Sequence, residues 1–351
     1  MKKYILILVS FFIFCNETKS EEFTILFMGD FLTCINIERL TRTEGADYPY
    51  RRIKPVIDKY DLVFANLESS ITERGKPVTN KAWVFRTSYF CASFLPSLGL
   101  DVVSLSNNHI LDYGKDGLID TIDFLKKNNI AFCGAGMNEA EARKPAVISF
   151  GKKQILFLAY NDLPPSYYYA KGNKYGSAQI NDEKIISDIR KYKTKDNLVF
   201  VSLHWGIEHS TKIKPEQIVQ AHKYIDAGAD GIIGHHPHVP QGVEIYKGKP
   251  VFYSLGNAVN GYYNQKYMPN IFGAVKIKDG NIAEIRVIPI EGDNYKMQFQ
   301  PFPLAGEEAV TFLKKVETLS SPFKTRFVID NGEAVVFPDA GKQHKASCDA
   351  R

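Results

Sequence analysis

Short, continuous apolar runs alternate along the chain with longer stretches in which apolar residues recur at helical spacing. The runs predict buried strands and the longer stretches predict amphipathic helices. The predicted strands cover residues 23–28, 61–65, 101–105, 130–133, 197–203, 229–234 and 251–255. The predicted helices cover residues 48–60, 88–98 (which Pro96 would end), 116–129, 181–192 and 215–227. Strands of this kind, separated by helices, indicate an α/β protein with a mostly parallel sheet covered on both faces.

Two further pairs of strands are predicted because a short turn joins each pair. Residues 146–150 and 154–160 flank a Gly-Lys-Lys turn, and residues 272–277 and 282–288 flank Asp279-Gly280, a hairpin dipeptide. Beyond about residue 290 the alternation loosens. We therefore expect one domain over residues 21–290, followed by a tail or small appendage over residues 291–351.

Polar side chains follow five of the predicted strands at the point where each strand ends. They are Asp30, Asn66 with Glu68, Asn107 with Asn108 and His109, His204, and His235 with His236 and His238. Open α/β sheets bind ligands at the carboxyl ends of their strands, so we expect these side chains at one rim. A mixed set of histidines, carboxylates and amides suits Mn, Fe or Zn, and the two oxygens of Glu68 can bridge two ions. The sequence therefore predicts a metal site at this rim.

Three of the eight histidines lie within residues 235–238, directly after an apolar run. Two histidines two positions apart on extended backbone point the same way, and Pro237 stiffens the segment. We expect His236 and His238 to be ligands and His235 to orient them. For His204, at the end of a strongly buried strand, the alternative is a hydrogen-bonded core histidine.

Taken in order, these motifs resemble the poly-γ-glutamate capsule synthesis protein family of the CapA type, part of the metallophosphoesterase (calcineurin-like) superfamily. The resemblance extends from about residue 23 to about residue 260. It rests on Gly29-Asp30, Asn66-Leu67-Glu68, Asn107-Asn108-His109 with Asp112, His204-Trp205-Gly206 with Glu208, His235-His236-Pro237-His238, and Ser254-Leu255-Gly256-Asn257. It implies a layered αββα sandwich with largely parallel central strands and a C-terminal antiparallel hairpin.

The resemblance also implies a role for each residue of the rim. Asp30 and His238 would bind a first divalent ion, Asn108, His204 and His236 a second, and Glu68 would bridge the two. His109 would be the acid that protonates the leaving oxygen. Supporting positions would be Asn66, Asn107, Asp112, Glu208, His235 and Asn257. The expected cofactors are one or two ions of Mn, Fe or Zn.

One position departs from the phosphoesterase pattern. Those enzymes usually carry a histidine two residues after the first aspartate, where this chain has Leu32. The first ion would then need a replacement ligand from Glu208, Asp112 or water. The departure argues mildly against a general phosphatase.

The first twenty residues have the composition of a secretory signal. Lys2 and Lys3 precede an apolar run over residues 4–14, and small residues stand at Thr18 and Ser20. The run is too short to span a bilayer comfortably. We expect a signal peptide over residues 1–20 and an exported protein, periplasmic, extracellular or on the cell surface, with an uncleaved anchor as the alternative.

The remaining composition is that of a globular protein, with 44% hydrophobic and 24% charged residues among 351. A formal charge of +5 is too small to indicate nucleic acid as a partner. Outside the predicted signal the cysteines, Cys34, Cys91, Cys133 and Cys348, show no paired spacing, which argues against a zinc ribbon or a disulfide framework.

These observations lead to an expected function. The chain would be a secreted, metal-dependent, phosphoesterase-like protein of capsule synthesis that hydrolyses an anionic cell-envelope polymer or a phosphoester. Two alternatives remain open: a non-catalytic, polyanion-binding subunit for capsule export or assembly, and a metal-dependent γ-glutamyl amide hydrolase. The partners implied by the resemblance are membrane-bound capsule synthesis or export proteins.

Overall fold

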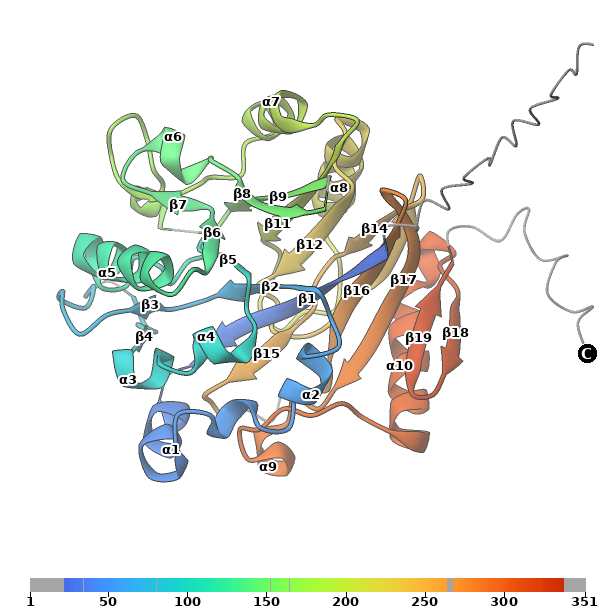
Figure 1. Cartoon of the computed structure of the whole chain (residues 1–351), viewed down its shortest axis with the longest axis horizontal. Helices are drawn as coiled ribbons and strands as arrows, with labels where there is room; N and C mark the ends of the chain where they lie inside the picture. The colour runs from blue at the N-terminus through green and yellow to red at the C-terminus, as the bar shows by residue number, and fades with distance from the viewer. Residues whose placement is uncertain are drawn as a thin grey trace, which may run out of the picture.

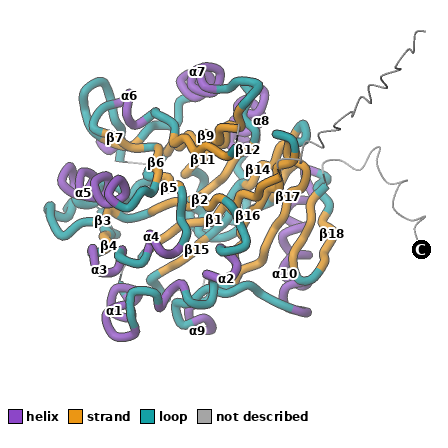
Figure 2. The backbone as a smooth tube through the Cα atoms, viewed as in Figure 1, coloured by secondary structure: helices purple, strands orange, loops and turns teal. Residues whose placement is uncertain are grey.

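A computed structural model of the chain describes residues 22–33, 35–79, 81–151, 153–163, 165–263 and 268–337. The predicted signal peptide, Cys34 and Cys348 lie outside these residues. The described chain forms two β-sheets packed face to face, with helices on the outer face of each sheet (Figure 1). Figure 2 shows the same layering, with strands in the middle and helices at the periphery. The layered αββα sandwich is therefore confirmed.

The larger sheet holds nine strands, and β1 lies at its centre. Their order is β18-β19-β17-β16-β1-β2-β5-β6, and β15 pairs with β1 beyond this path. The strands are β1 (Glu22–Leu32), β2 (Leu62–Leu67), β5 (Val102–Ser104), β6 (Ala131–Cys133), β15 (Asn257–Asn260), β16 (Asn270–Lys278), β17 (Asn281–Ile290), β18 (Phe327–Asp330) and β19 (Glu333–Val336). β1, β2, β5 and β6 run parallel, whereas β16 and β17 form the expected antiparallel hairpin.

The smaller sheet holds six strands in the order β13-β14-β12-β11-β9-β8. They are β8 (Ala146–Phe150), β9 (Lys153–Asn161), β11 (Asn197–His204), β12 (Gly231–His235), β13 (Val243–Tyr246) and β14 (Lys249–Phe252). The four central strands are parallel, and β8 and β13 are antiparallel edges. Two short ladders join β3 (Ser70–Ile71) to β4 (Arg86–Thr87) and β7 (Ala135–Gly136) to β10 (Gly176–Ser177).

Most helices cover the outer faces of the two sheets, whereas the last one packs against the core between them. The helices are α1 (Asn36–Glu44), α2 (Lys54–Ile57), α3 (Tyr89–Ala92), α4 (Leu95–Leu98), α5 (Gly114–Lys127), α6 (Glu139–Ala142), α7 (Asp182–Tyr192), α8 (Pro215–Asp226), α9 (Asn294–Met297) and α10 (Gly306–Ser320), with 3₁₀ turns at Tyr48–Tyr50, Ser166–Tyr168 and Ser321–Phe323.

Between the sheets Phe27 packs against Phe200, with ring centroids 5.1 Å apart. Within the described part of the chain, no helix is both long enough and apolar enough to cross a bilayer.

Two predicted helices are shorter and more broken than expected. The segment 48–60 contains only a 3₁₀ turn and α2, and the segment 88–98 divides into α3 and α4. Pro96 does not end a helix but lies in the first turn of α4. The N–H groups of a first turn have no acceptor within the helix, so a proline there costs no hydrogen bond. The predictions for α5, α7 and α8 are confirmed to within about two residues.

Residues 291–336, for which the sequence predicts a tail or small appendage, pack against the main body. β19 pairs with β17 and β18 with β19, which extends the larger sheet. Phe312, Leu313 and Val316 of α10 enter the apolar core between the two sheets. This segment therefore closes one edge of the sandwich.

Gly29 is required where β1 meets the segment before β15. A Cβ at this position would lie 1.9 Å from the carbonyl oxygen of Gly256, which accepts a hydrogen bond from Asp30 N. Gly29→Ala is therefore expected to lower the free energy of unfolding by about 3 kcal/mol. Gly306→Ala, where the Cβ has open space but φ is +55°, is expected to lose only about 1 kcal/mol. Urea unfolding in EDTA measures both values without a contribution from metal, and equal losses would contradict the argument.

Candidate functional site

The polar residues at the strand ends lie together at the rim between the two sheets. β1 brings Asp30, β2 brings Asn66 and leads to Glu68, and the loop after β5 brings Asn108 and His109. β11 ends at His204, and β12 ends at His235 and leads to the remaining two histidines. The structure thus places Asp30, Glu68, Asn108, His204, His236 and His238 around one centre.

Two groups of potential metal ligands share one residue. Glu68, His204 and His236 form one group and Asp30, Glu68 and His238 form the other, with the ligand atoms of each group within 4.8 Å of one another. Glu68 is fully buried, and neither of its oxygens has a hydrogen-bond partner among the described residues. A buried carboxylate without hydrogen bonds is costly unless a cation accompanies it. Imidazole nitrogen combined with carboxylate oxygen fits Mn, Fe or Zn, so the residues fit one or two such ions.

Asp30 is held ionised at the base of the centre. Its Oδ1 accepts a hydrogen bond from Asn66 Nδ2 (2.8 Å), and its Oδ2 accepts one from His236 N (3.1 Å). Burial opposes the charge, but His235 and His238 outweigh it and hold the pKa of Asp30 well below its usual range. His235 Nδ1 lies 3.2 Å from Asp30 Oδ1, although neither ring nitrogen of His235 is aligned for a hydrogen bond with a described residue.

The three candidate histidine ligands differ in the protonation state that their surroundings favour. Burial holds the pKa of His204 well below its usual range, and burial together with His238 lowers that of His236 to about 3. Both imidazoles are therefore neutral, the form that binds metal. Burial would also lower the pKa of His238, but Glu68 and Asp30 raise it to about 10. These two carboxylates favour a positive charge, which a divalent ion would also supply.

The backbone of the histidine segment differs from the sequence expectation. The segment is not extended, because His236 has φ +95° and His238 has φ +56°. Such positive φ values in residues other than glycine are strained, and such residues concentrate at functional sites. As a result the two histidines reach different donor groups, His236 beside His204 and His238 beside Asp30.

An amide network positions the loop after β5. Asn107 Nδ2 donates to Asn66 Oδ1 (3.1 Å) and to Leu67 O (2.8 Å), and Asn107 Oδ1 accepts from His109 N. Asn108 Oδ1 lies 2.9 Å from His204 Nε2, at the edge of the centre. Asn107 thus supports the loop, while Asn108 faces the candidate ligands.

His109 is oriented by a carboxylate. Its Nδ1 lies 2.6 Å from Asp112 Oδ2, which leaves Nε2 as the atom able to exchange a proton with a ligand in the pocket. Lys81 Nζ approaches the same pair, 2.7 Å from Asp112 Oδ1 and 3.0 Å from His109 Nδ1. Burial lowers the pKa of His109 to about 4 despite Asp112. Asp112 is therefore committed to His109 and Lys81 and does not replace the ligand missing at Leu32.

The other supporting residues lie at the margin of the centre. Asn257 Oδ1 lies 3.0 Å from His238 Nδ1. Glu208 lines the pocket beside His209, but its side chain is more than half exposed. Leu32 also lines the pocket, so the position that differs from the phosphoesterase pattern faces the same space as the candidate ligands.

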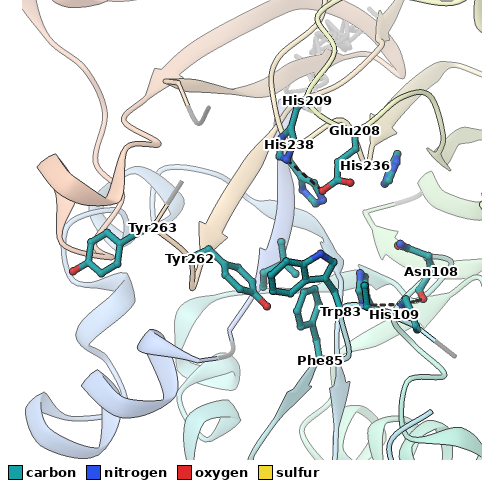
Figure 3. Close-up of a pocket in the computed structure, with 13 residues that line it drawn as sticks. Trp83, Phe85, Asn108, His109, Glu208, His209, His236, His238, Tyr262 and Tyr263 are labelled. Atoms are coloured by element: carbon teal, nitrogen blue, oxygen red, sulfur yellow. Dashed lines mark hydrogen bonds and ion pairs between the residues drawn. The ribbon is translucent and has the colours of Figure 1, made fainter. Parts of the chain in front are cut away.

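A pocket of about 340 Å³ opens beside the centre and has an aromatic side. Figure 3 shows Trp83, Phe85 and Tyr262 on one side, with His236, His238 and Glu208 across from them. The sequence reasoning missed Lys81 and these aromatic residues, because they lie on loops without a motif. Asn161, the buried last residue of β9, pairs with His204 in the sheet but is not among the residues that line the pocket.

Comparison with known proteins matches the sequence to the family described as "Bacterial capsule synthesis protein PGA_cap" over residues 24–262. The PGA biosynthesis protein CapA of Bacillus subtilis (strain 168) is 33% identical over 269 residues, which cover 76% of this chain and 70% of that protein. The capsule biosynthesis protein CapA of Bacillus anthracis is 30% identical over 284 residues, covering 78% and 69%.

Similar solved structures include the Haemophilus influenzae NAD nucleotidase NadN, with a TM-score of 0.48 and 15% identity, covering 86% of this chain and 63% of that one. The 5′-nucleotidase precursor from Thermus thermophilus has a TM-score of 0.45 and 14% identity, with coverages of 86% and 59%. The chain thus spans less than two thirds of either structure.

Proposed function

Because the chain belongs to the PGA_cap family of bacterial capsule synthesis proteins, we propose that it is a metal-dependent phosphoester hydrolase of cell-envelope polymer synthesis. The printed names of its relatives refer to the biosynthesis of PGA and of capsule. The proposal places this chain in the same setting, beside poly-γ-glutamate or a related anionic polymer. The signal-like residues 1–20 would direct it out of the cytoplasm, to membrane-bound synthesis or export partners.

The observation that carries the proposal is the shared position of Glu68. It belongs to both donor groups, and its oxygens are buried without hydrogen bonds to described residues. Asp30 and His238 would hold one ion, His204, His236 and Asn108 the other, and Glu68 both. Such ions, when bound, supply Lewis acidity to a phosphoryl or carbonyl oxygen.

The protein residues supply the proton chemistry. Asp112 orients His109 through Nδ1, and Nε2, once it has taken up a proton, can donate that proton to a leaving oxygen in the pocket. Phe85 stacks on the His109 ring at a centroid distance of 4.1 Å, which restricts its rotation and its contact with water. An oriented, shielded acid beside the candidate ligands favours hydrolysis over a purely binding role.

The test begins with protein purified from the envelope of the producing cells. Elemental mass spectrometry is expected to find Mn, Fe or Zn at up to two ions per chain, and the N-terminal residue is expected near position 21. Metal-stripped protein reloaded with each ion is then assayed for phosphate release from phosphomonoesters and for shortening of γ-glutamyl oligomers. Phosphate release that requires metal supports the proposal.

The other outcomes separate the alternatives. Metal-dependent shortening of γ-glutamyl oligomers without phosphate release would replace the proposal with an amide hydrolase. Polymer binding without turnover of either substrate would favour the non-catalytic subunit. Recovery of the chain from the cytoplasm with Met1 retained would contradict the export part alone.

A further inference from the structure

One side of the pocket is formed by three aromatic rings, Trp83, Phe85 and Tyr262, which we call the aromatic wall (Figure 3). Trp83 meets Tyr262 edge to face, with centroids 5.6 Å apart and an interplanar angle of 82°. Tyr262 meets Phe85 at 5.4 Å. The three rings therefore pack on one another and form a continuous surface.

Trp83 is unusual within this wall because its residue surface is 60% exposed, whereas Phe85 is buried. An indole exposed to water at the mouth of a pocket forgoes the stabilisation that its burial would give. Exposed apolar surface of this kind, gathered at a concave site, marks a ligand-binding surface. Because the contact with Tyr262 leaves much of the indole exposed, a ligand can bury it by stacking.

The aromatic wall leads directly to the proposed acid. Phe85 stacks on His109 at 4.1 Å, so the rings extend from the edge of the candidate metal centre to the pocket mouth. A ligand group stacked on Trp83 would lie on the same side of the pocket as His109, the side of the leaving group. The wall is thus placed to recognise the part of the substrate that departs.

The charges of the pocket do not suit a chain of carboxylates. Among the described lining residues Lys81 is the single lysine or arginine, and its Nζ already contacts Asn108 O, Asp112 and His109. The face of an aromatic ring carries partial negative charge, so it does not attract a carboxylate. Beyond the candidate ligands, the pocket therefore offers stacking surface and no uncommitted cation.

We propose that the aromatic wall binds an uncharged ring with a face that can stack, in the alcohol portion of the substrate, which makes the substrate a ring-bearing phosphoester. This inference rests on the proposed hydrolase function and names its substrate class. A cavity of about 340 Å³ accommodates one such ring next to a phosphoryl group. A nucleobase stacks through its flat aromatic face and a sugar ring through its apolar C–H face, and the experiment below distinguishes them.

Trp83 provides its own probe. The chain has two tryptophans, and the other, Trp205, is fully buried, so quenching of the exposed fluorescence reports on Trp83. Metal-loaded protein is mixed with adenosine 5′-monophosphate, glucose 1-phosphate, glycerol 3-phosphate or tetra-γ-glutamate, and fluorescence is read within seconds, before turnover. At least one ring-bearing ester is expected to quench Trp83 and to bind about tenfold more tightly than glycerol 3-phosphate.

Two variants at the exposed position isolate the ring contact. Calorimetric titration of Trp83→Ala is expected to lose the tenfold preference, and Trp83→Phe, which keeps a flat face, is expected to retain most of it. Preference for adenosine 5′-monophosphate assigns a nucleobase, and preference for glucose 1-phosphate assigns a sugar. Equal binding of glycerol 3-phosphate, quenching by tetra-γ-glutamate at similar affinity, or an unchanged preference in Trp83→Ala would overturn the inference.

The two proposals fail in different ways. Hydrolysis of glycerol 3-phosphate at the same efficiency as the ring-bearing esters, without quenching of Trp83, leaves the hydrolase standing and overturns the role of the wall. Ring-dependent quenching without phosphate release leaves the wall standing and overturns the hydrolase. Failure of all four probes to bind metal-loaded protein overturns both.

Discussion

Substitution of Glu68 by glutamine is expected to abolish the stabilisation of the protein by divalent metal. Glu68 contributes to both donor groups, so the single change weakens both at once. The neutral amide oxygen of glutamine is a poorer ligand for a divalent cation than a carboxylate oxygen. At a metal concentration of about 1,000 times Kd, binding linkage contributes about 4 kcal/mol to stability, and this is the amount that the variant is expected to lose.

The same substitution is expected to act in the opposite direction on the metal-free protein. Burial and the charge of Asp30 raise the pKa of Glu68 well above its usual range. A carboxyl whose pKa is raised by folding destabilises the native state once the pH exceeds its unfolded pKa. At neutral pH the metal-free Glu68→Gln protein is therefore expected to be more stable than the metal-free wild type, by about 1 kcal/mol.

Calorimetric unfolding with and without EDTA measures both effects, and elemental mass spectrometry measures the metal. Glu183→Gln, the same change in the exposed first turn of α7, is the matched control and should match the wild type in both states. If Glu68→Gln retained two ions and the full metal-induced stabilisation, Glu68 would not be the shared ligand.

Substitution of His109 by asparagine is expected to reduce turnover by a factor of about 10²–10⁴ while leaving the metal content unchanged. Asparagine has a similar size and can hydrogen bond to Asp112, but it cannot carry a proton to a leaving oxygen. His109 belongs to neither donor group, so the ions should remain. Rates of phosphate release, measured beside metal content, separate a catalytic role from a structural one.

His222→Asn is the matched control for this experiment. His222 lies on α8, is part exposed, contacts Glu244 with its Nε2 at 2.8 Å, and is not among the residues that line the pocket. The control should keep wild-type turnover. Unchanged turnover in His109→Asn would remove His109 from the mechanism, and a loss of metal in that variant would assign it to the metal centre instead.

The sequence predicted the location of the centre because parallel strands deliver their carboxyl ends to one edge. Asp30, His204 and His235 each end an apolar run, so burial and strand direction together determine where their side chains go. The same logic predicted α5, α7 and α8, whose apolar spacing is regular. The spacing of apolar residues predicts a helix reliably where the helix is long enough for the spacing to repeat.

The remaining features depend on contacts between segments that no local pattern encodes. Lys81 and Trp83 lie on a loop, and they reach the pocket only because the loop folds over the segment after β5. The positive φ values at His236 and His238 were not expected, because residues other than glycine rarely adopt them and no local pattern marks them. The division of the segment 88–98 follows from the tolerance of a helical first turn for Pro96.

The place of β16 in the larger sheet bears on how the chain is divided into modules. The family match ends at residue 262, but β1, which carries Asp30, pairs along most of its length with β16 at residues 270–278. β16 in turn pairs with β17, and α10 fills the core beneath them. The segment matched by the family model is therefore shorter than the sheet that carries Asp30. We therefore expect a fragment that preserves the rim to extend through Val336, because the C-terminal strands belong to the sheet that positions Asp30.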